Sequence, residues 1–83
     1  MNLTVLNAKD GFAVTTNDST DLTKSCVALY IGGAGTGTLK VTTIKGNALS
    51  FVGIPAGFVL NLQCSRVWAT GTGVTNIVAL CNE

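Results

Sequence analysis

Turn-forming residues divide this chain into short segments, and that spacing limits what it can fold into. Glycine, proline, asparagine and aspartate recur about every 8–12 residues, which is typical of small all-β domains. No segment has the 3.6-residue apolar period of a helix. Over 83 residues the pattern predicts a single β-domain spanning residues 1–83, either a small antiparallel β-sandwich of jelly-roll type or a small barrel.

The apolar segments between the turns are of strand length. Strands are predicted over residues 26–31, 39–44, 48–52, 58–70 and 76–81. Residues 58–70 form either one long strand or two strands, 58–62 and 63–70, with a bulge. In the second segment, Leu39 and Val41 alternate with Lys40 and Thr42, as a strand with one buried face requires.

The N-terminal part is less regular. Residues 1–17 are predicted to form an arm or a hairpin that takes part in assembly, with Asp10-Gly11 as the turn signal. Residues 17–21 (NDSTD) follow, a polar run of turn formers. Asp18 and Asp21 lack the glycine and glutamate of a calcium loop, so a turn is expected there and no metal site.

Charge is scarce and dispersed. There is no histidine, the formal net charge is +1, and 47% of the residues are apolar. So small a net charge provides no electrostatic attraction to nucleic acid or anionic membranes. The sequence also lacks the run of about 18 apolar residues that a membrane span needs. A nucleophile would have no histidine as its base, so we expect no enzymatic activity and no cofactor. Residues 1–5 lack the features of a signal peptide, so the chain is expected to fold where it is made.

Three cysteines, Cys26, Cys64 and Cys81, each lie in or beside an apolar segment. Free cysteine in such a setting behaves as a small buried hydrophobe, so buried thiols are expected. One disulfide would leave an odd thiol over, and a zinc site without histidine would need an unusual ligand set.

Residues 32–37 (GGAGTG) invite comparison with a phosphate-binding loop. A dinucleotide loop needs a G-x-G-x-x-G spacing and a following helix, whereas an alternating strand segment follows here. We therefore predict a flexible hairpin loop whose glycines adopt positive φ.

The local cluster with binding character is Arg66-Val67-Trp68. On a strand, Arg66 and Trp68 face one side and Val67 the other, and both types are enriched at interfaces. The alternative is Trp68 in the core with Arg66 extended towards solvent at its edge. A high apolar fraction in so short a chain also favours burial against neighbouring chains. The candidate subunit-interface residues are Leu3, Val5, Phe12, Arg66 and Trp68.

An ordered series of short motifs runs from Asp18 to Leu80. The motifs are residues 18–22 (DSTDL), 28–35 (ALYIGGAG), 39–43 (LKVTT), 51–57 (FVGIPAG), 66–72 (RVWATGT) and 77–80 (IVAL). In order and spacing the series resembles the small spike base proteins of tailed bacteriophages and phage-like gene transfer agents. Residues 35–38, the N-terminal segment and the last three residues depart from that pattern.

The resemblance implies a virion structural protein, made in the bacterial cytoplasm and located on the capsid surface. It would be a homo-oligomeric spike base or decoration protein whose partners are other copies of itself, the major capsid protein and a spike or fibre protein. The alternatives are a capsid cement protein, a tail or baseplate β-module, and a free glycan- or peptide-binding module. Glycan sites usually present several exposed aromatic side chains, and this chain has three phenylalanines, one tyrosine and one tryptophan without a cluster.

Overall fold

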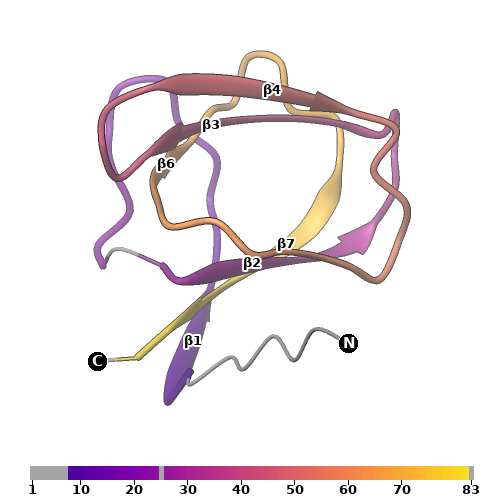
Figure 1. Ribbon diagram of the computed structural model, residues 1–83. Helices are drawn as coiled ribbons and strands as arrows, with labels where there is room; N and C mark the ends of the chain where they lie inside the picture. The colour runs from indigo at the N-terminus through magenta and orange to yellow at the C-terminus, as the bar shows by residue number, and fades with distance from the viewer. Residues whose placement is uncertain (1–7, 25, 83) are drawn as a thin grey trace, which may run out of the picture.

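Two antiparallel sheets make up the computed structural model, which describes residues 8–24 and 26–82. The four-stranded sheet has the order β1-β7-β2-β5 and the three-stranded sheet has the order β4-β3-β6. The strands are β1 (Asp10–Ala13), β2 (Ala28–Gly33), β3 (Thr38–Thr43), β4 (Ala48–Val52), β5 (Phe58–Leu60), β6 (Cys64–Val67) and β7 (Thr75–Cys81). The sheets lie one above the other (Figure 1), which confirms the all-β prediction as a sandwich.

The predicted strands lie close to the observed ones. β4 matches its prediction, and β3 begins at Thr38, one residue before the predicted segment. Residues 58–70 are two strands, β5 and β6, and these belong to different sheets. The chain crosses from one layer to the other over residues 61–63, so the break is a change of sheet rather than a bulge.

Alternation along β3 sets the two faces of the three-stranded sheet. Leu39 and Val41 are fully buried, whereas Lys40 and Thr42 are partly exposed on the outer face. Val41 lies opposite Val67 of β6, and Thr42 lies opposite Arg66. The predicted period of two is confirmed, and it places Lys40, Thr42 and Arg66 together on the outer face.

The predicted hairpin at residues 32–37 is wrong. β2 pairs with β7 and β5, and β3 pairs with β4 and β6, so the loop between β2 and β3 carries the chain from one sheet to the other. Gly32 and Gly33 extend β2, and the turn itself is closed by the Gly37 N–H donating to the Ala34 carbonyl at 2.6 Å. Gly35 and Gly37 have the expected positive φ, 51° and 76°.

Asp10 and Gly11 lie inside β1 rather than at a turn. β1 pairs with the C-terminal strand β7, with Gly11 opposite Leu80. A Cβ at Gly11 would lie 2.9 Å from the Ala79 carbonyl oxygen, so the absence of a side chain permits this close approach. The Asp10-Gly11 pair thus marks a close approach of β1 to β7 and not a turn.

The core lies between the two layers. Its members are apolar residues from β2, β3, β6 and β7 and from the adjoining loops: Cys26, Leu29, Ile31, Leu39, Val41, Ile54, Cys64, Val67, Val74, Ile77 and Ala79. No polar or charged residue of the described chain is buried. Residues 8–24 and 26–82 contain no helix long and apolar enough to cross a membrane.

Candidate functional site

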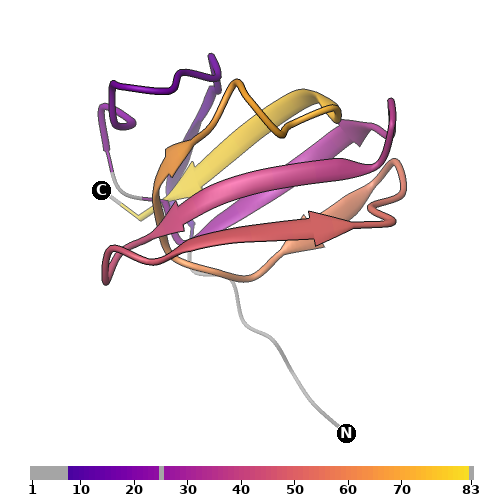
Figure 2. The same ribbon diagram turned by 90° about the horizontal axis from the view of Figure 1, so that it is seen from above.

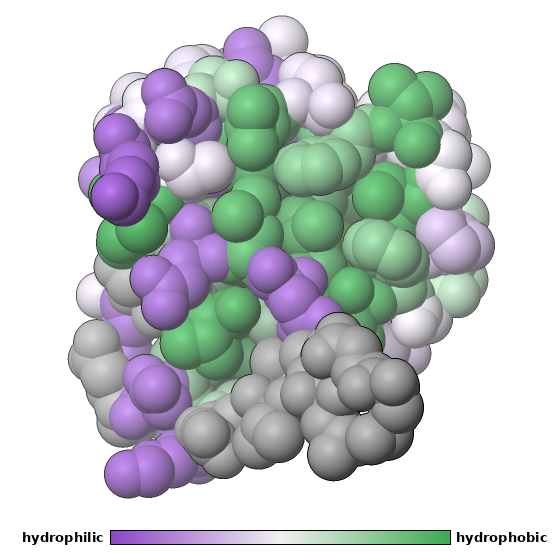
Figure 3. All heavy atoms as spheres, in the orientation of Figure 1, coloured by the Kyte–Doolittle hydropathy of each residue, from purple (hydrophilic) through white to green (hydrophobic). Residues whose placement is uncertain are grey.

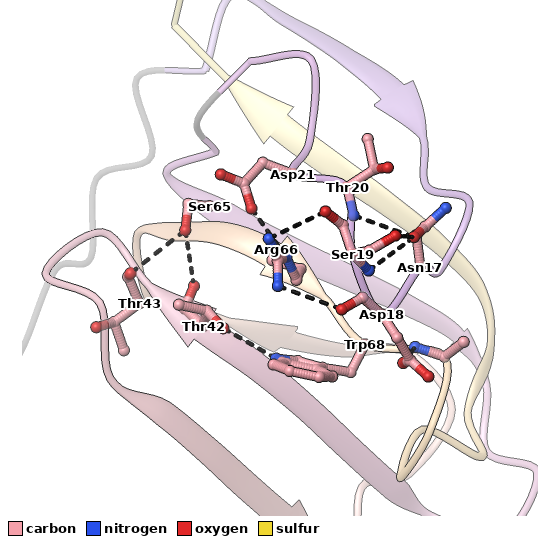
Figure 4. Close-up of polar contacts among 11 residues, drawn as sticks. Asn17, Asp18, Ser19, Thr20, Asp21, Thr42, Thr43, Ser65, Arg66 and Trp68 are labelled. Carbon is pink, nitrogen blue, oxygen red and sulfur yellow. Dashed lines mark hydrogen bonds and ion pairs between the residues drawn. The ribbon is translucent and has the colours of Figure 1, made fainter.

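Trp68 lies on the outer face of the three-stranded sheet, directly after β6, and is not part of the core cluster. Its backbone N–H donates to the Lys40 carbonyl at 2.9 Å, and its indole N–H donates to Thr42 Oγ1 at 2.9 Å (Figure 4). Lys40 Nζ is 4.3 Å from the ring centroid and Arg66 Cζ is 5.4 Å away. The partly buried indole is therefore held by β3 and by two cations, each attracted to its π-face.

Arg66 uses its donors within the chain. Its Nε donates to Asp21 Oδ1 at 2.9 Å, and its two terminal nitrogens donate to the carbonyls of Asp18 and Ser19 at 3.3 Å each. Figure 4 shows the guanidinium pointing from β6 towards this loop. The side chain is 24% exposed, so the ion pair fastens the loop to the sheet and still presents a charged edge to solvent.

Residues 17–21 form the predicted turn. The Asn17 side-chain oxygen accepts the N–H groups of Ser19 at 2.8 Å and Thr20 at 3.0 Å, which closes the loop on itself. The carboxylates of Asp18 and Asp21 do not converge: Asp18 bonds to Ala69 and Thr70, and Asp21 to Arg66. Within the part of the chain that the structure describes, no three histidine, cysteine or acidic residues group as metal ligands.

The Asp18 carboxylate joins this turn to the loop after Trp68. It accepts the Thr70 hydroxyl at 2.6 Å and the N–H groups of Ala69 and Thr70 at 2.9 and 2.8 Å. These hydrogen bonds, with the Thr70 hydroxyl contributing most, hold the pKa of Asp18 below its ordinary value of 3.8. The ionised carboxylate is thus a structural acceptor, and both of its oxygens accept hydrogen bonds from within the chain.

The three cysteines are buried and free, as predicted. Cys26 and Cys64 lie side by side: the Cys26 N–H donates to the Cys64 carbonyl at 3.2 Å. The Cys64 thiol lies 3.4 Å from the Leu62 carbonyl, and its contact with Cys26, together with burial, raises its pKa. A buried thiol with a raised pKa is a weak nucleophile, which fits a packing role.

An open cavity of about 290 Å³ lies between β1 and the loop that follows it. Phe12 lines it together with Ala13, Thr15, Asn17, Thr20, Asp21, Leu22 and Thr23. Phe12, one of the predicted interface residues, therefore borders a cavity that opens to solvent. It also packs against the core. The lining mixes apolar side chains with threonine hydroxyls and one carboxylate, Asp21, which is paired with Arg66.

The structure brings two of the five predicted interface residues together. Arg66 and Trp68 share the outer face of the sheet, whereas Phe12 lies on β1 in the other layer; Leu3 and Val5 lie outside the described residues. Sequence reasoning missed Lys40 and Asp18 as parts of the Arg66 and Trp68 cluster. The alternation of β3 could have pointed to Lys40, but pairing of β3 with β6 was needed to place it over the indole.

Comparison with known proteins gives one informative likeness. No family model matches the chain, and no curated protein matches it. Among solved structures, it is similar to a chain in the structure described as the capsid of a native GTA (gene transfer agent) particle computed with C5 symmetry. The sequence identity is 31%, the TM-score is 0.76, and the match covers 93% of this chain and 90% of that one. This protein therefore belongs to the same family as that component of a gene transfer agent capsid.

Proposed function

We propose that this protein is a virion structural subunit that acts on the capsid surface as a homo-oligomeric spike base or decoration protein. The observation that carries the proposal is the likeness to a gene transfer agent capsid chain over almost the whole length of both chains. Its partners would be other copies of itself, the major capsid protein and a spike or fibre protein. It would be made in the bacterial cytoplasm and work in the virion.

The site chemistry supports a role in assembly rather than catalysis. The cysteines are buried, Asp18 and Asp21 are engaged in hydrogen bonds, and Arg66 is bound to a loop. The outer face presents a partly buried indole, hydrogen-bonded to Thr42, with two cations beside it. Such a surface suits protein contact, since tryptophan and arginine combine large area with directional polar groups. With net charge +1, neither nucleic acid nor a membrane surface is proposed as a partner.

The proposed subunit contacts are Arg66 and Trp68 on one layer and Phe12 on the other, with Leu3 and Val5 from the N-terminal segment. Weak contacts between subunits become durable attachment when many copies bind together on one particle. A small domain with a net charge of only +1 and modest contacts is therefore sufficient for this role.

Removal of the chain from the particle tests the proposal. Particles should be purified from cells that express the chain and from cells in which its gene is deleted. A spike base predicts intact capsids that lack spikes or fibres. Capsids that break at lower temperature would indicate cement instead, and loss of tail parts would indicate a baseplate module. Particles unchanged in composition, shape and stability would refute a virion role.

A further inference from the structure

One of the four sheet edges is left open. β6 is covered, because the Asn17 N–H donates to the Val67 carbonyl at 3.0 Å and the Leu22 N–H to the Ser65 carbonyl at 2.8 Å. β5 has only three residues, and β1 carries the exposed Asp10, which is 4.0 Å from Lys24. These are ordinary ways to protect an edge. β4 has five residues, ALSFV, with no charge, no proline and no bulge.

The backbone of β4 offers hydrogen-bonding groups to a further strand. The Thr43 N–H donates to the Asn47 carbonyl at 2.8 Å, which fixes the phase of the ladder between β3 and β4. Since antiparallel pairs alternate, Leu49 and Phe51 direct their backbone groups towards β3. Ala48, Ser50 and Val52 direct theirs outward. Among the residues that the structure describes, none pairs with that outer side.

Apolar side chains accompany this edge. Leu49 lies opposite the fully buried Val41, yet it is 41% exposed, because β4 is the last strand on its side. Val52 is 83% exposed. In Figure 2, β4 (red) lies along the lower side of the sandwich and β5 (salmon) at its lower right, and this lower side faces the viewer in Figure 3. There, green apolar residues extend across the middle and upper right of the face (Figure 3).

We propose that residues 1–7 of a neighbouring copy add to the outer edge of β4 as an extra strand. This inference rests on the homo-oligomer proposed above. The segment, MNLTVLN, carries no charged side chain and alternates Leu3 and Val5 with polar Thr4. Leu3 and Val5 then lie on the inner face beside Leu49 and Phe51, while main-chain hydrogen bonds form with β4, as in other strand additions.

The geometry favours a neighbour over the chain's own N-terminal segment. β1 and β5 are the opposite edges of one sheet, three strand spacings or about 14 Å apart. β4 lies on the same side of the molecule as β5 (Figure 2) but in the other layer (Figure 1). Pairing with β4 uses five residues, and the two that remain span only about 7 Å. The donor and the acceptor surfaces therefore meet between copies.

A contact between opposite sides of two copies is head-to-tail. Each copy gives one segment and receives another, so the assembly grows until the rotation between copies closes a ring. The proposed spike base is such a closed assembly. A two-fold contact that joins β4 to β4 directly would stop at a dimer.

Complementation between two variants tests this arrangement by native mass spectrometry over a concentration series. The first variant, Leu3→Asp/Val5→Asp, has a defective segment and an intact edge. The second, Ser50→Pro, has an intact segment and a blocked edge; the Ser50 N–H points outward, so proline removes no bond to β3. Each variant alone should have the mass of the 8.5 kDa protomer, and the equimolar mixture should give a heterodimer.

Controls separate assembly from folding. Thr4→Asp places its charge on the opposite face and should keep the wild-type mass. Thermal melts show whether Ser50→Pro folds, and Val52→Pro serves as a second block if it does not. Variants that keep the wild-type oligomer, or a mixture that stays monomeric, overturn strand addition alone. A wild-type chain that is monomeric at every concentration overturns the homo-oligomer as well.

Discussion

The Asp18 carboxylate accepts the hydroxyl and the backbone N–H of Thr70, at 2.6 and 2.8 Å, and so ties together two loops 52 residues apart in sequence. One loop is the turn that covers the edge of β6, and the other follows Trp68. Together with the ion pair between Arg66 and Asp21, this contact sets the shape of the outer face.

The contact makes stability depend on pH. The pKa of Asp18 is lower in the folded chain than the ordinary value of 3.8, so its contribution is complete above that value and is lost as the pH falls through the folded pKa. Asp18→Asn should lower Tm at about pH 7, and the difference in Tm between the two proteins should shrink as the pH falls below 3.8. Thermal melts across this range check it; a constant gap would contradict the ionised acceptor.

The indole and the guanidinium should matter for assembly. Trp68→Ala and Arg66→Ala should each raise the concentration at which the oligomer dissociates, measured by native mass spectrometry. Asp21→Asn is the matched control, because it removes the ion pair and keeps the Arg66 side chain. Its effect on stability should be at most about 1 kcal/mol, since the pair is partly exposed. Unchanged dissociation in Arg66→Ala and Trp68→Ala would remove both residues from the interface.

Reducing agent should leave stability unchanged, because all three thiols are free and buried. Melts with and without reductant should coincide, and thiol labelling should find three reactive groups only after unfolding. A clear fall in Tm with reductant would show that a disulfide forms, and Cys26 with Cys64 would then be the adjacent pair to examine.

Gly35 should tolerate no side chain. Its φ is +51°, and a Cβ there would collide with the backbone carbonyl of Gly73. Gly46 is the control, since its φ is +92° and a Cβ would meet nothing within 4 Å. Gly46→Ala should lower the free energy of unfolding by about 1–2 kcal/mol, because alanine disfavours this backbone conformation. Gly35→Ala should lower the free energy of unfolding, measured in urea, by more than Gly46→Ala does. Equal decreases would mean that the loop can move to accommodate the added Cβ without strain.

Most of the fold follows from local pattern, and the site does not. Alternation at Leu39 to Thr42 identified the buried and exposed faces of β3 because one face must leave water. The hairpin predicted at residues 32–37 was wrong, because a turn signal shows where the chain bends and not which sheet it enters next. Lys40 and Trp68 meet only through pairing between strands distant in sequence, which no local period reports. Asp18 joins the site through hydrogen bonds to Ala69 and Thr70.

Labelling of intact particles tests the capsid-surface role most directly. Antibody against this chain, coupled to gold, should be imaged on unbroken particles by electron microscopy, with particles from the deletion strain as the control. The account predicts gold at the capsid surface and none on the tail. Gold confined to the tail, or particles that carry no gold although the chain is expressed, would contradict it.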